Sequence, residues 1–285
     1  MEFLQPSTWD DALAAKAEHP AAVPVAGGTD VMVELNFDRR RPPALLDLTR
    51  VRPLADWSMD GPWLRIGAGV SYRRVIDELG GRLPGLAIAA RTVGSPQIRN
   101  RGTVGGNLGS ASPAGDAHPP LLASGARVEL ASLRGVRTVP VAEFFTGPKR
   151  SVLAPDELIA AFLVPPAAGP QQFAKVGTRN AMVIAVCSFA LSLDPGRRTA
   201  GTGIGSAGPT PRSAPAAESF LAAELPWEGG PLPEAVARRF GELVASAARP
   251  IDDVRGTAAY RRHALSVLAR RTLTWAWQEV VDGCG

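Results

Sequence analysis

The sequence predicts a protein of mixed α/β and α+β class, in which an N-terminal β-α-β part precedes a C-terminal α+β domain. Residues 20–50 alternate strand, glycine-containing loop, helix and strand, which is the unit of a parallel sheet. After residue 170, strand patterns come first and helix patterns follow, as is typical of α+β domains. A proline-containing break at residues 165–170 separates the two parts.

In the N-terminal part, a helix is expected to begin with Ser7 and Asp10 as a capping box and to end near Pro20. We predict the other elements from apolar periodicity, caps and turn residues. They are strand 22–25, a helix from 31 to the arginines 39–41, strands 44–48 and 63–66, a helix capped by Ser71 and ending at 79, helix 86–92, a Gly/Ser-rich loop over 94–115, a helix with Asp116 as its N-cap that carries Leu121 and Leu122, and strands 127–131, 136–139 and 158–164.

The C-terminal part has three strand patterns followed by three helix patterns. The predicted strands are 172–176, 182–193 and 200–206, and the predicted helices are 212–223, 234–248 and 256–280. The stretch from Gly203 to Gly208 matches G-x-G-x-x-G, but prolines follow at once. A dinucleotide fingerprint requires a helix to begin inside the motif, so we interpret this one as a strand end and a turn.

Composition and charge exclude several classes of protein. The 285 residues are 45% hydrophobic and 20% charged, which excludes global disorder. The net charge of +4 comes without a dense basic stripe, so no nucleic-acid partner is expected. The longest uncharged apolar run, residues 180–193, is too short to cross a bilayer, and the N-terminus lacks the apolar segment of a signal peptide. We therefore expect a cytoplasmic protein with no membrane span.

Cysteine and histidine are too sparse for a metal centre. Cys187 and Cys284 cannot form a disulfide framework, and an iron–sulfur cluster normally takes four cysteines. The three histidines show no metal-ligand spacing, so no metal site is predicted. Cys187 lies in an apolar segment and is expected to be buried, whereas Cys284 near the end of the chain is expected to be free.

The first candidate site is Gly27-Gly28-Thr29-Asp30, which follows a predicted strand and precedes a predicted helix. Glycine lets a backbone approach a ligand closely, and the start of a helix offers free N–H groups that suit a phosphate. Asp30 has the wrong charge for a phosphate and fits a cap or a ribose contact better. On spacing alone, an ordinary tight turn capped by Thr29 or Asp30 is the favoured interpretation.

The second candidate is Thr103-Val104-Gly105-Gly106-Asn107, which continues to Asp116. Residues 102–115 carry no charge and few large side chains, so the backbone N–H groups and small hydroxyls are what this loop offers a ligand. Such a concave backbone can hold a pyrophosphate. The alternative is a flexible linker. Two loops of this kind suggest a dinucleotide held between two subdomains.

These motifs together resemble the FAD-binding (medium) subunit of the molybdenum hydroxylases, of the carbon monoxide dehydrogenase and xanthine dehydrogenase type. The resemblance covers nearly the whole chain and places it among vanillyl-alcohol-oxidase (PCMH)-type flavoproteins. The segments that carry it are 26–30, 97–107, Ser112-Pro113 with Asp116, 121–126, 208–212, and Arg255-Gly256 with 260–262.

The resemblance implies three units: a small N-terminal β/α subdomain (1–53), a larger α/β subdomain (54–168) and the C-terminal α+β domain (169–285). FAD would lie between the first two. The implied FAD-binding residues are Pro24, Val25, Ala26, Gly27, Gly28, Thr29, Asp30, Val31, Thr103, Val104, Gly105, Gly106, Asn107, Ser110, Ser112, Asp116, Ile159 and Lys175. No catalytic side chain is assigned, because the isoalloxazine carries the redox chemistry.

The resemblance also implies partners: a large molybdopterin-binding subunit, and a small [2Fe–2S] subunit that passes electrons to FAD in this chain. The acceptor would be NAD, a quinone or oxygen. Relatives often carry an acidic or aromatic residue near the flavin, where this chain has Arg179-Asn180-Ala181-Met182. That departure leaves open a stand-alone FAD-dependent oxidase or dehydrogenase of a small molecule. A binding protein that has lost its flavin is disfavoured by the intact glycine loops.

Overall fold

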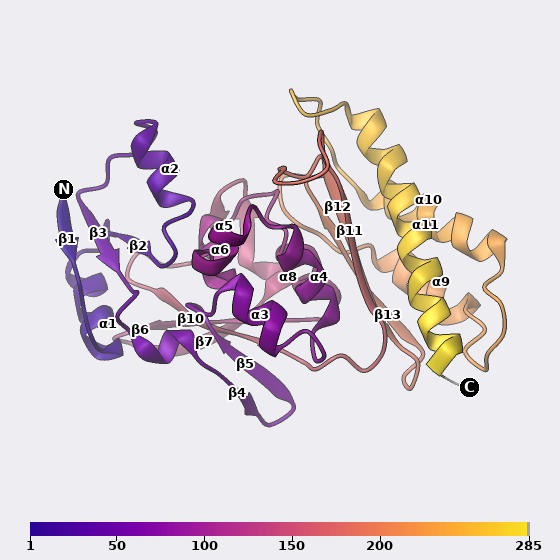
Figure 1. The fold of residues 1–285 in the computed structure, drawn as a ribbon, viewed down its shortest axis with the longest axis horizontal. Helices are drawn as coiled ribbons and strands as arrows, with labels where there is room; N and C mark the ends of the chain where they lie inside the picture. Colours follow the sequence, from indigo (N-terminus) through magenta and orange to yellow (C-terminus); the bar gives the residue numbers. More distant parts are fainter. Residues whose placement is uncertain (284–285) are drawn as a thin grey trace.

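The computed structural model describes residues 1–283, which form three sheet-based units in a row (Figure 1). The N-terminal unit lies at one end, the helical layer of the C-terminal unit lies at the other, and the second unit lies between them (Figure 1). Cys284 lies outside the described residues. The predicted unit boundaries at residues 53 and 168 stay predictions.

The first unit contains a three-stranded parallel sheet in the order β1-β3-β2. Its elements are β1 (Glu2–Leu4), α1 (Trp9–Glu18), β2 (Val23–Val25), α2 (Val31–Asn36) and β3 (Ala44–Asp47). The predicted β-loop-α-β unit over residues 20–50 is therefore confirmed. The capping box at Ser7 is wrong by one residue, because Thr8 is the N-cap and accepts from the N–H of Asp11. Helix α2 contains no buried residue and projects from the unit (Figure 1).

The second unit contains a five-stranded sheet in the order β4-β5-β10-β6-β7. All its strand pairs are antiparallel, so this unit is of α+β rather than α/β type. Its elements are the 3₁₀ helix η1 (Arg52–Ala55), β4 (Trp57–Asp60), β5 (Trp63–Gly67), α3 (Tyr72–Glu78), α4 (Pro84–Thr92), α5 (Pro96–Arg101), α6 (Val104–Ser110), α7 (His118–Ala123), β6 (Arg127–Ser132), β7 (Gly135–Pro140), α8 (Val141–Phe144), β8 (Phe145–Gly147), β9 (Arg150–Ser151) and β10 (Leu158–Val164).

The expected Gly/Ser-rich loop over residues 94–115 contains two short helices, α5 and α6. The glycines of α6 disfavour helix, and α5 is only six residues long, so local propensity missed both helices. Two side-chain caps compensate: Ser95 accepts from the N–H of Ile98, and Thr103 accepts from the N–H of Gly106. Packing in the core of the second unit also stabilises α6, whose Val104 and Leu108 are fully buried.

Asp116 does not cap helix α7, contrary to the sequence prediction. The N-cap position is Ala117, with no side-chain hydrogen bond. The Asp116 carboxylate instead forms an ion pair with Lys175 of the third unit. A partner 59 residues away in the sequence is invisible to a local capping pattern.

The third unit packs three helices against a three-stranded antiparallel sheet, β11-β12-β13 (Figure 1). Its elements are β11 (Gln171–Val176), β12 (Cys187–Asp194), β13 (Thr199–Gly205), α9 (Pro215–Glu224), α10 (Glu234–Ala247) and α11 (Ala258–Gly283). The strands-then-helices prediction is confirmed, although β12 begins five residues later than predicted. Gly203 and Gly205 lie inside β13, so no helix begins within their G-x-G-x-x-G motif.

Two large hydrophobic cores and one small cluster hold the described residues together. One core joins α1 and β3 of the first unit to the sheet of the second, and the other lies between β12, β13 and helices α9–α11. The small cluster joins α4 and α7 of the second unit to β11 and β12 of the third. Cys187 is completely buried in the second core, as predicted. Burial also raises the pKa of its thiol to about 12, so the thiol stays protonated and unreactive. Across residues 1–283, no helix is long and apolar enough to cross a membrane.

Candidate functional site

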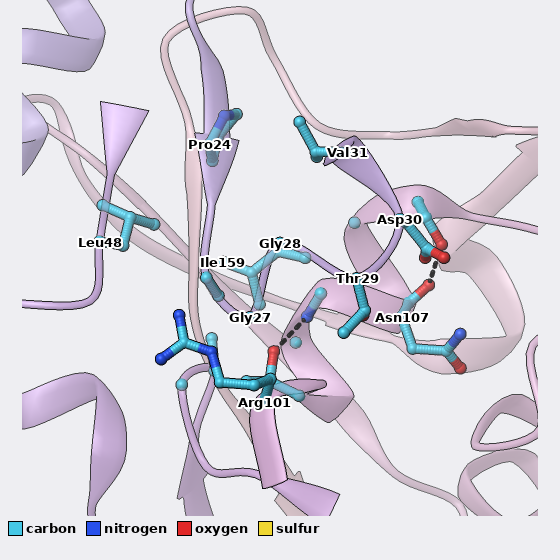
Figure 2. Close-up of a pocket in the computed structure, with 18 of the residues that line it drawn as sticks. Pro24, Gly27, Gly28, Thr29, Asp30, Val31, Leu48, Arg101, Asn107 and Ile159 are labelled. Carbon is cyan, nitrogen blue, oxygen red and sulfur yellow. Dashed lines mark hydrogen bonds between the residues drawn. The ribbon is translucent and has the colours of Figure 1, made fainter. Parts of the chain in front are cut away.

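A cavity of about 580 Å³ lies between the first and second units. The loop from β2 to α2 lines one side, and the start of α6 with strand β10 lines the other. Figure 2 shows Gly27 and Gly28 close to Arg101, with Thr29, Asp30 and Asn107 along the same cavity. The two glycine loops identified from the sequence therefore line one cavity.

The first loop leaves β2 at Val25 and turns into α2. A Cβ atom at Gly27 would overlap the backbone carbonyl of Arg101, so only glycine permits this approach of the two units. Gly28 has a φ of +75°, a conformation that also favours glycine. Within residues 1–283, the N–H groups of Gly28 and Thr29 donate to no protein acceptor. They are available to a ligand in the cavity.

The second loop is the first turn of α6. The Thr103 hydroxyl accepts from the N–H of Gly106 at 2.8 Å, which fixes the start of the helix. A Cβ atom at Gly105 would overlap the backbone of Ala68, so this glycine allows α6 to lie directly on the end of β5. Gly105 and Gly106 have no side chains, so at these two residues only the backbone of α6 lines the cavity.

The structure brings most of the predicted site residues to the cavity wall. The predicted residues that line it are Pro24, Ala26, Gly27, Gly28, Thr29, Asp30, Val31, Thr103, Gly105, Gly106, Asn107, Ser110 and Ile159. The predicted residues outside the lining are Val25, Val104, Ser112, Asp116 and Lys175. Val104 is completely buried, so its side chain belongs to the core.

Asp116 and Lys175 contact each other instead of the cavity. The Lys175 Nζ lies 2.6 Å from Asp116 Oδ2, and it also donates to the carbonyls of Thr92 and Val183. Both side chains are about nine-tenths buried. Burial raises the pKa of Asp116, and the positive charge of Lys175 opposes that rise. The pair joins the loop after α6 to strand β11, and so links the second unit to the third.

Charged side chains of both signs surround the cavity mouth. Lys149, at the tip of the β8–β9 hairpin, donates to Glu34 of α2 at 2.6 Å, so this ion pair connects the second unit to the first. That hydrogen bond lowers the pKa of Glu34 below its ordinary value. Arg40 lies 3.8 Å from the same carboxylate. Two cations therefore line the same cavity as the neutral backbone donors of Gly28 and Thr29.

Sequence reasoning missed many of the residues that line the cavity, among them Tyr72 and Lys149. Tyr72 lies at the start of α3, and its N–H donates to the carbonyl of Gly102. Burial raises the pKa of Tyr72 well above its ordinary value, and the charges of Asp116 and Asp30 add to the effect, so the hydroxyl stays protonated. Neither residue belongs to a recognisable motif, and only the fold brings them to the site.

The donor set fits a dinucleotide cofactor better than a metal. Free backbone N–H groups, the Thr29 hydroxyl and glycines at the closest approaches are what a pyrophosphate requires. In residues 1–283, no cluster of three His, Cys, Asp or Glu side chains could hold a metal ion.

Comparison with known proteins agrees with this geometry. Residues 1–167 match the FAD-binding domain in molybdopterin dehydrogenase, and residues 172–276 match the CO dehydrogenase flavoprotein C-terminal domain. The chain is 31% identical to the xanthine dehydrogenase FAD-binding subunit of Escherichia coli O157:H7, over 96% of this chain and 95% of that one. It is 29% identical to the nicotine 6-hydroxylase medium subunit of Paenarthrobacter nicotinovorans, over 97% of each.

The fold is also shared with a solved structure. Carbon monoxide dehydrogenase from Hydrogenophaga pseudoflava contains a chain that superposes with a TM-score of 0.89 at 26% identity, over 98% of both chains. The two family matches and this superposition together cover the N-terminal cavity and the C-terminal helical unit.

Proposed function

Because the chain belongs to the family of FAD-binding domains in molybdopterin dehydrogenase, we propose that it is the electron-transfer subunit of a molybdenum hydroxylase. In this role it takes electrons from [2Fe–2S] clusters of a partner subunit and passes them to an external acceptor such as NAD, a quinone or oxygen. When bound, FAD supplies the redox chemistry, and the chain supplies binding, orientation and electrostatics.

The observation that carries the proposal is the meeting of the two glycine loops at one cavity. In this proposal the N–H groups of Gly28 and Thr29 would donate to a pyrophosphate from the first unit, and the first turn of α6 would approach it from the second. Asn107 and Ser110 add polar side chains, and Ile159 supplies an apolar contact on β10. We propose that these residues bind FAD.

We propose that Asp116 and Lys175 support the cavity rather than line it. They lie outside the cavity lining, but their ion pair fixes the end of the second loop against β11. We propose that they determine the position of the loop through residues 110–116, and that any direct contact with the cofactor requires the pair to rearrange. Ser112 belongs to the same loop and accepts from the N–H of Ala114.

The partners of the complex follow from the relatives. Their names describe subunits of xanthine dehydrogenase and nicotine 6-hydroxylase, and the superposed chain comes from a CO dehydrogenase. We propose a large molybdopterin-binding subunit and a small [2Fe–2S] subunit as partners of this chain. Its cysteines are too few for iron–sulfur clusters of its own, which agrees with the proposal that the clusters lie on a partner subunit.

The test is purification from the native source through a tag on this chain, with bound subunits, Mo, Fe and flavin measured together. A complex of three chains that holds Mo, Fe and FAD is expected. A yellow protein that carries FAD but neither metal nor partners would instead support a stand-alone flavoenzyme, the alternative that the uncharged Asn180-Ala181 segment leaves open. A colourless chain that fails to bind added FAD would overturn both.

A further inference from the structure

We infer that His118 is a positioning residue for the cavity: its buried imidazole holds the segment from Asn107 to Ala117 in the shape that presents Asn107 and Ser110 to a ligand. The inference rests on the proposed function, because the ligand is the FAD proposed above. His118 is the first residue of α7 and does not itself line the cavity.

The carbonyl of Asn107 is the point at which the segment is held. His118 Nε2 lies 3.1 Å from this oxygen, and the Ser110 hydroxyl donates to the same oxygen at 3.0 Å. The Asn107 side chain closes the loop in the other direction, since its Oδ1 accepts from the N–H of Ala117 at 3.4 Å. Hydrogen bonds of Asn107, a residue of the cavity wall, thus join the beginning of the segment to its end.

Packing leaves the imidazole no alternative position. His118 is completely buried, and its ring lies against Phe145 with 4.5 Å between ring centroids. A Cβ atom at Gly115 would overlap His118 Cε1 and lie 2.7 Å from Asn107 Oδ1. The glycine is therefore needed to let the segment close around the ring.

The protonation state of the ring follows from its surroundings. A carbonyl oxygen can only accept, so Nε2 carries the proton and donates to Asn107. Burial lowers the pKa of His118 to about 4, which outweighs the opposite effect of the carbonyls of Asn107 and Ser112. Nδ1 is then a buried acceptor with no partner in residues 1–283. An unpaired buried polar atom costs stability, so packing alone would be better served by an apolar side chain.

The experiment compares His118→Leu, His118→Gln and a matched control, His263→Leu, in the full chain. Leucine fills space without a donor, glutamine keeps an N–H donor, and His263 is exposed on α11. FAD affinity is measured by fluorescence titration of the deflavinated protein, and the melting temperature is measured without FAD. Hydrogen exchange of residues 107–117 provides a readout that does not depend on FAD.

We expect His118→Leu to weaken FAD binding about three- to tenfold, as for the loss of one hydrogen bond. Its melting temperature without FAD should stay the same or rise, and exchange of residues 107–117 should accelerate. His118→Gln should bind within about twofold of the wild type, as should His263→Leu.

Wild-type affinity and exchange in His118→Leu would overturn the inference. So would an equal loss in the glutamine variant, because the imidazole would then act only through its shape. If His118→Leu does not fold, His118→Met is measured in its place. If neither variant folds, His118 is a core residue that the fold itself requires, and the inference is overturned. Failure of the wild-type chain to bind FAD would count against the proposed function, while the exchange data would still decide the role of His118.

Discussion

Gly27 lies where the backbones of the first two units are in direct contact, which makes it a sensitive position in the site. We predict that Gly27→Ala lowers the free energy of unfolding by about 1–3 kcal/mol, as is usual when a methyl group is forced into a packed contact. The added methyl would overlap the carbonyl of Arg101 and push the β2–α2 loop out of the cavity wall. FAD affinity should fall together with stability. Denaturant unfolding and FAD titration measure the two effects.

The control is Gly81→Ala, because a Cβ atom at Gly81 meets no other atom within 4 Å and its backbone requires no positive φ. It should change stability by no more than about 0.5 kcal/mol. Equal behaviour of the two variants would show that the loops do not pack as described.

Lys175 supports a second residue-scale prediction, because it neutralises a buried carboxylate. Lys175→Met should cost about 3–5 kcal/mol at neutral pH, since it leaves the charge of Asp116 uncompensated in the interior. Lys149→Met is the matched control: Lys149 is mostly exposed, and its loss should cost no more than about 1 kcal/mol. Denaturant unfolding of both variants tests the difference.

The cost of Lys175→Met should depend on pH with a definite sign. Burial raises the pKa of Asp116 in the folded chain, and removal of the cation raises it further. The folded variant then binds a proton more readily than the unfolded chain, so its stability rises as pH falls through the raised pKa. The deficit relative to wild type should therefore shrink from pH 7 to pH 5. A deficit that grows on acidification would contradict this account.

At the scale of elements, sequence patterns located those whose signals are local. The β2–α2–β3 unit was predictable because its apolar spacing and turn residues lie within a few residues of each other. The helix after Ser71 was predictable because its side-chain cap is local. Helix α6 was not predictable, because Gly105 and Gly106 disfavour helix, and this is offset by the Thr103 cap and by burial of Val104 and Leu108. The three-residue strand β1 was missed because it is too short for an alternating pattern.

The same distinction applies to the site. The two glycine loops were predictable because glycine followed by a hydroxyl residue before a helix has a physical meaning on its own. The Asp116–Lys175 pair and the position of Lys149 were not, because each depends on a contact between units that are distant in the sequence.

The N-cap of α6 gives an element-scale prediction with an internal control. Thr103→Val and Thr8→Val each remove a hydroxyl that caps a first turn, from α6 and α1 respectively. Each should lower the free energy of unfolding by about 0.5–2 kcal/mol. Only Thr103→Val should also weaken FAD binding, because only α6 begins at the cavity. Unfolding and FAD titration of both variants separate the effects, and an equal loss of affinity in the two would argue against a role for α6.

At the scale of the whole molecule, the third unit is attached to the second along helix α7. A Cβ atom at Gly201 or Gly203 would overlap the carbonyl of Ala123 or Pro119, so the glycines of β13 allow the strand to lie directly on α7. The G-x-G-x-x-G motif therefore contributes to packing between units rather than to nucleotide binding. Because α7 begins with His118, just after Asp116, the contact between α7 and β13 also supports the second loop of the cavity.

We predict that Gly203→Ala weakens the contact between α7 and β13 and makes the third unit unfold separately from the other two. The wild-type chain with FAD should melt in one calorimetric transition, because the Lys175 pair and the α7–β13 contact couple the two cores. In Gly203→Ala, a methyl group must displace the carbonyl of Pro119, so two transitions should appear, and FAD should stabilise the one that contains the cavity. Gly196→Ala is the control, because its Cβ would meet only Asp194, at an ordinary 3.5 Å, in the exposed β12–β13 turn. A single FAD-dependent transition in Gly203→Ala, unchanged from wild type, would contradict this prediction and mean that the other contacts between the units, such as those of Gln171 with Gly85 and Ser124, are enough to couple them.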